Sequence, residues 1–160
     1  HERAADLVIG QPGFDSAVEF PYRPQGPQRF RFPYGVTSAP DGRLFVADTS
    51  NNRVLVVDDA AATFAATPVG GSVDVALGQP DLDANGENRW DRVVADSFCW
   101  PYGLHWGDGL LAVADSGPLG VAVGPTGKRP GKLGSVTWGV MAGRGRVRRV
   151  GTVSSTPPRQ

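Results

Sequence analysis

The sequence predicts an all-β fold, and three of its features lead to this prediction. Glycine and proline account for 22 and 14 of the 160 residues, a content that favours many turns over long helices. Apolar residues fall in short runs bounded by turn residues, which is typical of β-strands. The same series of motifs also occurs twice, about 68 residues apart, which indicates a repeat architecture.

The repeat rests on three motifs that recur in one order. They are Gly10-Gln11-Pro12, which recurs as Gly78-Gln79-Pro80; Phe32-Pro33-Tyr34-Gly35, which recurs as Trp100-Pro101-Tyr102-Gly103; and Ala47-Asp48-Thr49, which recurs as Ala114-Asp115-Ser116. The last pair is one residue closer than the others because the turn at 40–43 is shortened at 107–109. We therefore predict two repeat units, at about 5–59 and about 74–123, within a domain that spans residues 1–123.

Strands are expected in the apolar runs between the turns. These runs lie at 35–37, 44–47 and 54–57 in the first unit and at 103–106, 110–114 and 121–123 in the second. Their shortness, and the Gly and Asp residues that interrupt them, disfavour buried helices. Because the runs are continuously apolar, we expect strands buried on both faces, as in a sheet packed between two neighbours.

The first unit resembles a known repeat. Residues 30–58 read Phe-x-Phe-Pro-Tyr-Gly-Val, then Asp-Gly-Arg-Leu-Phe-Val-Ala-Asp-Thr, then Asn-Asn-Arg-Val-Leu-Val-Val-Asp, and this segment resembles the NHL repeat. The Gly-Gln-Pro segments at 5–14 and 75–82 resemble those that precede each repeat in many bacterial members. The resemblance, which covers residues 5–116, implies that each repeat supplies one β-propeller blade and that the closed fold has about six blades around a central channel.

Two units cannot close a ring of blades, since each blade buries its faces only against its neighbours. We therefore expect a β-propeller fragment of about two NHL-type blades, belonging to a longer protein and followed by a Gly/Arg/Pro-rich tail. This tail, residues 124–160, contains no acidic residue and no third Gly-Gln-Pro motif. Three interpretations stay open for it: a disordered low-complexity tail, a segment outside the natural reading frame, and a nucleic-acid-binding arm around the arginines at 144–149.

The net charge of zero conceals an uneven distribution. Residues 1–116 hold eight Lys and Arg against sixteen Asp and Glu, whereas residues 117–160 hold eight Lys and Arg and no acidic residue. The acidic repeat region argues against binding of nucleic acid by the repeats, so nucleic acid is not the expected partner. No apolar run reaches the roughly 18 residues of a membrane helix, so no membrane span is expected.

Few residues are arranged for catalysis. His105 lies within an apolar run and Cys99 between two aromatic residues, where packing roles are expected, so no catalytic, cofactor-binding or metal-binding residue is assigned. The acidic segment 81–85 has the alternation of a calcium loop, but its twelfth position is Arg92 rather than glutamate. A divalent cation is expected only under an alternative function. In that alternative the chain is part of a metal-dependent lyase or lactonase-like hydrolase, of the kind found among similar propellers.

The favoured hypothesis is a non-catalytic scaffold for protein–protein interaction or small-ligand binding. Aromatic and arginine side chains gather on the segments between each Gly-Gln-Pro motif and the following Pro-Tyr-Gly strand, a composition favoured at binding hot spots. The candidate binding rim comprises Tyr22, Arg23, Arg29, Arg31, Trp90 and Arg92. The repeat assigns structural roles to Gly10, Gln11, Pro12, Pro33, Gly35, Asp48, Asn52, Arg53, Gly78, Gln79, Pro80, Pro101, Gly103 and Asp115. Among these, Asp48 and Asp115 are expected to accept hydrogen bonds at strand ends, and Arg53 to brace a turn or a neighbouring blade.

Overall fold

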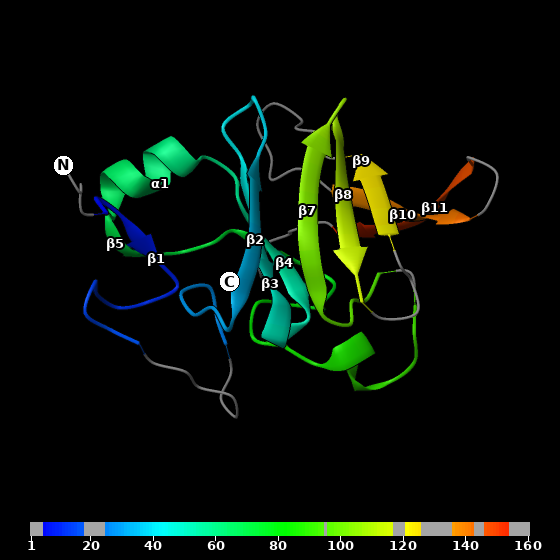
Figure 1. Ribbon diagram of the computed structural model, residues 1–160, viewed down its shortest axis with the longest axis horizontal. Helices are drawn as coiled ribbons and strands as arrows, with labels where there is room; N and C mark the ends of the chain where they lie inside the picture. The colour runs from blue at the N-terminus through cyan, green and yellow to red at the C-terminus, as the bar shows by residue number, and fades with distance from the viewer. Residues whose placement is uncertain are drawn as a thin grey trace, which may run out of the picture.

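The computed structural model describes residues 5–17, 25–94 and 96–116, together with the backbone of three strands within 117–160. Two antiparallel sheets contain most of the strands, and Figure 1 shows them side by side. The prediction of an all-β fold is confirmed, because strands predominate over helices. Two members of the candidate rim, Tyr22 and Arg23, lie outside the described residues.

The first sheet is a meander formed by the first repeat unit. Its strands are β2 (Pro33–Ser38), β3 (Leu44–Asp48), β4 (Arg53–Val57) and β6 (Val75–Leu77), in the order β2-β3-β4-β6. The turn between β3 and β4 contains the 3-10 helix η1 (Thr49–Asn51). The strands β3 and β4 are almost wholly buried, which agrees with the continuous apolar runs of their sequence.

A short helical excursion separates β4 from β6. Helix α1 (Ala60–Ala66) begins where the side chain of Asp59 accepts a hydrogen bond from the backbone N–H of Ala62, at 3.0 Å. Strand β5 (Val69–Gly71) follows and pairs in parallel with β1 (Val8–Ile9). The sequence analysis did not predict this helix, although the N-cap residue Asp59 and the alanine-rich run after it are both helix signals.

The second sheet repeats the arrangement of the first. Its strands are β7 (Pro101–Gly107), β8 (Leu110–Asp115), β9 (Val121–Pro125), β10 (Val136–Ala142) and β11 (Arg146–Val153), in the order β11-β10-β9-β8-β7. The 3-10 helix η2 (Glu87–Trp90) lies on the segment that leads into β7. Strand β10 pairs with β9 as β6 pairs with β4, so it occupies the place of a fourth strand in the second sheet.

The segment 124–160, predicted as a basic low-complexity tail, therefore contains strands. The structure describes β10 and β11 within it, paired antiparallel, and in this respect it differs from a wholly disordered tail. Both strands contain several β-branched residues, which favour strand pairing. Whether the segment belongs to the natural reading frame stays a prediction.

The two sheets pack face to face through an apolar core. Phe45, Val54 and Val56 of the first sheet meet Leu111 and Val113 of the second. The ring of Phe45 stacks on that of Trp106, with centroids 5.7 Å apart, and the guanidinium of Arg43 lies over both rings. The opposite face of the first sheet is covered in part by residues from other segments, among them Ile9, Phe30, Ala60 and Leu82.

The burial of strand β8 differs from the burial that its sequence predicts. Its apolar run predicted burial on both faces, but Leu111 and Val113 are buried whereas Leu110 and Ala114 are exposed. The physical reason is that only one face of the second sheet packs against the first sheet, whereas β3 and β4 of the first sheet are covered on both faces.

The glycine of each Gly-Gln-Pro motif makes room for an aromatic ring. Gly10 and Gly78 both have positive φ, +80° and +89°, and a Cβ on either would lie within 2.5 Å of the ring of Phe30 or Phe98, respectively. The ring in question lies at the same distance along the chain in both units. The glycine of the motif therefore provides a left-handed backbone conformation and a close approach to an aromatic ring, and only glycine permits both.

This arrangement predicts that Gly78→Ala destabilises the fold more than a substitution at a comparable glycine without a neighbour. Gly42 is the matched control, because its φ is +93° and nothing lies within 4 Å of a Cβ built on it. Gly42→Ala is expected to cost the left-handed penalty of about 1–2 kcal/mol. Gly78→Ala adds about 1–3 kcal/mol for overpacking against Phe98. Urea unfolding measures both, and equal losses in the two variants would contradict the steric account.

Candidate functional site

A buried ion pair lies where β3 ends and β4 begins. The Nε of Arg53 donates to Oδ2 of Asp48 at 2.7 Å, and both side chains are 0% exposed. The carboxylate of Asp48 also accepts from the side-chain amide of Asn51, at 2.8 Å, and from the backbone N–H of Arg31. The charged groups are therefore surrounded by hydrogen-bond partners, which a buried pair requires.

The guanidinium of Arg53 also holds two loops together. It donates to the backbone oxygens of Arg29, at 2.8 Å, and of Leu82. The backbone N–H of Gln25 donates to the oxygen of Asp83 at 3.2 Å. The loop that precedes β2 and the loop that follows the second Gly-Gln-Pro motif therefore lie against each other over this arginine.

Burial dominates the electrostatics of Asp48. It raises the pKa of the Asp48 carboxyl above the usual range, while the charge of Arg53 and the hydrogen bonds from Asn51, Arg31 and Arg53 act in the opposite direction. A carboxylate in this position depends on every donor around it, since its desolvation is offset only by them.

Hydrogen bonds from the β3–β4 turn join the two units at the same end of the sheets. The hydroxyl of Thr49 donates to the oxygen of Pro101 at 2.6 Å, and Oδ1 of Asn52 accepts from the N–H of Trp100 at 2.9 Å. The side-chain amide of Gln79, which is buried, donates to the backbone oxygens of Asn52 and Gly86. The glutamine of the second Gly-Gln-Pro motif thus ties the loop after it to the turn of the first unit.

The second unit keeps only part of this network. Asp115 accepts from the N–H of Cys99 at 2.9 Å, as Asp48 accepts from the N–H of Arg31. The position that corresponds to Arg53 is Gly120, so no arginine follows Asp115 at this place in the sequence. Burial raises the pKa of the Cys99 thiol, and the nearby carboxylates of Glu87 and Asp115 raise it further, which disfavours a reactive thiolate.

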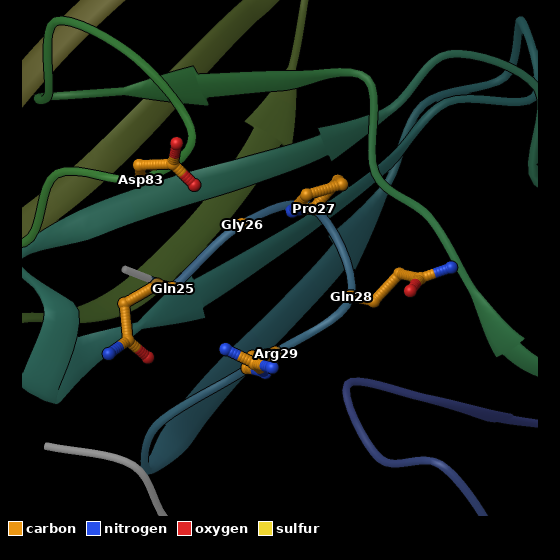
Figure 2. Close-up of a pocket in the computed structure, with 6 residues that line it drawn as sticks. All are labelled: Gln25, Gly26, Pro27, Gln28, Arg29 and Asp83. Carbon is orange, nitrogen blue, oxygen red and sulfur yellow. The ribbon is translucent and has the colours of Figure 1, made fainter. Parts of the chain in front are cut away.

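A pocket of about 260 Å³ opens in the loop that Arg53 fixes. Figure 2 shows that the loop 25–29 surrounds it, with the carboxylate of Asp83 on the adjoining loop turned toward Gly26. Gln25 is 2% exposed, and its side-chain oxygen accepts a hydrogen bond from the side-chain amide of Asn51 at 3.1 Å. A buried hydrogen bond therefore fixes the wall of the pocket that Gln25 forms. Arg29 of the candidate rim lines this pocket.

Trp90 is held outward on a left-handed turn. Asn88, Arg89 and Trp90 have φ of 45°, 59° and 59°, which is uncommon for residues other than glycine. The turn is fastened because Arg89 bonds Asp96 at 2.7 Å and the N–H of Asn88 donates to the oxygen of Phe98 at 3.0 Å. Trp90 is nevertheless 77% exposed, more than any other large hydrophobic residue in the described part of the chain.

The remaining rim residues are divided between the two loops. Arg31 is partly buried, and its backbone N–H bonds Asp48 while its guanidinium donates to the oxygen of Ser50. Arg92 is exposed, two residues after Trp90. The structure therefore brings the loops of Arg29 and Trp90 to the same end of the two sheets, through the contacts of Arg53 and Gln79.

Among the described residues, no three His, Cys, Asp or Glu side chains gather as ligands of a metal ion. Asp81 instead accepts hydrogen bonds from the N–H groups of Asp83 and Ala84, which is the geometry of a turn. Over the same part of the chain, no helix has both the length and the apolar composition needed to cross a bilayer.

One segment of the chain is similar to a known repeat. Residues 30–57 match the NHL repeat, and this segment contains β2, β3 and β4 of the first sheet together with Asp48 and Arg53. No curated protein matches the chain. The match shows that this segment is similar to the NHL repeat, and it agrees with the small all-β propeller fragment that the two sheets form.

The ion pair predicts a large loss of stability for Asp48→Asn, which leaves the charge of Arg53 buried without its carboxylate. The expected decrease in the free energy of unfolding is about 3–5 kcal/mol. The control is Asp41→Asn, because Asp41 pairs with Arg43 at 2.8 Å but keeps 34% of its side chain exposed. That variant should lose less than about 1 kcal/mol. Urea unfolding compares the two, and similar losses would show that Asp48 does not hold the loops.

A second prediction concerns Arg53→Lys, which keeps the positive charge but not the planar fork of donors. Lysine cannot reach Asp48 and the oxygens of Arg29 and Leu82 together, so the loop 25–29 should open more often. Hydrogen exchange at the N–H groups of Gln25 and Val73, both bonded across this loop, should become faster by about tenfold or more. Unchanged exchange at these amides, with β3 and β4 equally protected, would show that the ion pair alone suffices.

Proposed function

We propose that this chain is a non-catalytic propeller-type scaffold that binds a protein segment through the loops at one end of its two sheets. The binding surface consists of the loop 25–31 and the loop 81–92, and its anchors are Arg29 and Trp90. In this proposal the repeat belongs to the bacterial type that carries a Gly-Gln-Pro segment, since Gln79 is the residue that fastens the second loop.

The exposed indole of Trp90 is the observation that carries the proposal. A tryptophan that is 77% exposed has no role in the core, and here it stands on a turn that is strained and fastened at both sides. Rigid aromatic side chains bind partners at little cost in conformational entropy, and tryptophan and arginine are enriched at binding hot spots. The turn therefore presents a prepared anchor to a partner.

The rigidity of the loops supports the same function. Arg53 fixes the first loop and Gln79 the second, so neither has to be ordered when a partner binds. The pocket beside Arg29 offers a small recess for one side chain of the partner.

The charge of the region indicates the chemistry of the partner. Residues 1–116 carry sixteen acidic and eight basic residues, and Asp83, Glu87 and Asp91 are exposed on the second loop. A partner segment with Lys or Arg residues complements this charge, and such a cation can also lie on the face of the Trp90 indole.

Selection from a random peptide library displayed on phage, with the whole chain immobilised, tests the proposal. Enriched peptides should contain basic residues, and fluorescence polarisation measures their affinity for variants. Trp90→Ala should weaken binding by about thirtyfold, the equivalent of a 2 kcal/mol hot spot, and Arg29→Ala should also weaken it.

The control is Leu110→Ala, since Leu110 is exposed at the far end of β8 from Asp115 and should leave the affinity unchanged. The proposal is wrong if no peptide is enriched, or if the enriched peptides bind the Trp90 and Arg29 variants as well as they bind the unaltered chain.

A further inference from the structure

The loop 81–92 contains the dipeptide Asn85-Gly86, and Asn85 is the only asparagine of the chain that a glycine follows. Asparagine is thermolabile because its short side chain lies close to the backbone nitrogen of the next residue, which can attack it. Glycine has no side chain to hinder that attack. Whether the reaction takes place then depends on how the structure holds the side-chain amide and the backbone nitrogen.

The structure leaves both reacting groups of this dipeptide without a hydrogen bond. Asn85 is half-buried, and no described residue bonds its side-chain amide or the backbone N–H of Gly86. The main-chain oxygen of Asn85 is used instead, since it accepts from the side-chain amide of Asn52 at 3.0 Å. No hydrogen bond to the described residues therefore has to break before the nitrogen of Gly86 attacks Cγ of Asn85.

Each of the other three asparagines of the chain has a bonded side chain. Asn51 and Asn52 donate hydrogen bonds from their side-chain amides, at 2.8 and 3.0 Å, and Asn88 accepts one at 3.1 Å. The backbone N–H groups that follow Asn51 and Asn88 are also bonded, to oxygens at 3.0 and 2.9 Å. Reaction at these positions has to break such contacts first, so Asn85 is the asparagine that the structure leaves open to it.

We infer that Asn85 is a site of spontaneous deamidation. The backbone nitrogen of Gly86 loses its proton and bonds to Cγ of Asn85, the bond from Cγ to the side-chain nitrogen breaks, and ammonia leaves. The product is a cyclic succinimide, which water opens at either of its two carbonyls. One opening yields aspartate. The other yields isoaspartate, in which the main chain continues through Cβ and Cγ, and both products carry a new negative charge.

Isoaspartate adds a carbon to the main chain at a place that is held on both sides. The side-chain amide of Asn52 holds the oxygen of Asn85, and that of Gln79 holds the oxygen of Gly86 at 2.8 Å. In isoaspartate the first of these oxygens becomes part of a free carboxylate, and the longer chain displaces at least one of the two contacts. Gly86 is therefore expected to shift.

The position of Trp90 depends on Gly86. A Cβ on Gly86 would overlap the indole of Trp90, so the ring lies directly against the main chain there. The N–H of Arg89 also donates to the oxygen of Gly86, at 2.9 Å, within the left-handed turn. A shift of Gly86 therefore moves an anchor of the binding surface. This consequence rests on the proposed function: deamidation of Asn85 weakens the binding of the partner and limits the time for which each copy binds it.

Incubation of the whole chain at physiological temperature and pH, followed by peptide mapping with mass spectrometry, tests the site. Over days, the peptide that contains Asn85 should gain the mass difference between an amide and a carboxylic acid, and chromatography should resolve isoaspartate from aspartate. Reaction should be at least about tenfold faster than at the other three asparagines, whose hydrogen bonds have to break first. The rate should rise with pH, because the attacking nitrogen has to lose its proton.

Asn85→Gln is the control for the chemistry, because it keeps an amide on a longer side chain that does not readily form the ring. This variant should keep its mass under the same conditions. Intact Asn85 after incubation, or reaction at Asn51, Asn52 or Asn88 at the same rate, would overturn the inference.

A peptide whose binding depends on Trp90 tests the consequence for the binding surface. The isoaspartate form, separated by ion exchange, should lose affinity toward the roughly thirtyfold loss expected of Trp90→Ala. Asn85→Asp introduces the charge without the added carbon and should lose less. Hydrogen exchange at the N–H of Arg89 should also become faster in the isoaspartate form.

These measurements separate the two proposals. Equal affinity and equal exchange in the isoaspartate form and the unaltered chain would overturn the effect on Trp90 and leave the proposed function standing. If no peptide is enriched from the library, the proposed function is wrong, whereas the mass measurement and the exchange at Arg89 still decide whether Asn85 reacts and whether the turn moves.

Discussion

The buried pair of Asp48 and Arg53 is the interaction on which the loops of the proposed binding surface depend. It joins the start of β4 to the end of β3, and its remaining donors reach the loops at Arg29 and Leu82. A buried ion pair contributes little to the free energy of unfolding by itself, because the desolvation cost of removing two charges from water offsets their attraction. Its importance lies in what it holds: neither loop has a sheet of its own to support it, and both take their position from the same guanidinium.

The positions of most strands were predictable because they depend on local patterns. Short apolar runs between turn residues gave the locations of β2, β3, β4, β7 and β8, and their ends differed from the structure by at most a few residues. Burial was less predictable, since the apolar run of β8 resembles that of β3 although only one of its faces is covered. Whether one or both faces of a sheet are covered depends on what packs against the sheet, and the residue pattern of a single strand does not encode it.

The site was visible in the sequence only in outline. Aromatic and arginine residues before the strands indicated the loops, but the partners of Arg53 lie far from it in the chain and show no local signal. The Gly-Gln-Pro motif was recognised as a repeat, but the role of its glycine was not predicted. The two units together indicate this role, because Gly10 and Phe30 have the same spacing as Gly78 and Phe98, and a residue pair with constant spacing indicates a contact.

The parallel pairing of β1 with β5 has a consequence for the order of assembly. Val8 meets Val69, so β1 can join only after β2, β3, β4 and α1 have emerged from the ribosome. The turns that join β2, β3 and β4 are short and close at small entropic cost, whereas the pairing of β1 with β5 closes a long loop that contains these turns. During synthesis β2, β3 and β4 can therefore pair before β1 does, and β1 is among the last parts of its repeat unit to be fixed in place.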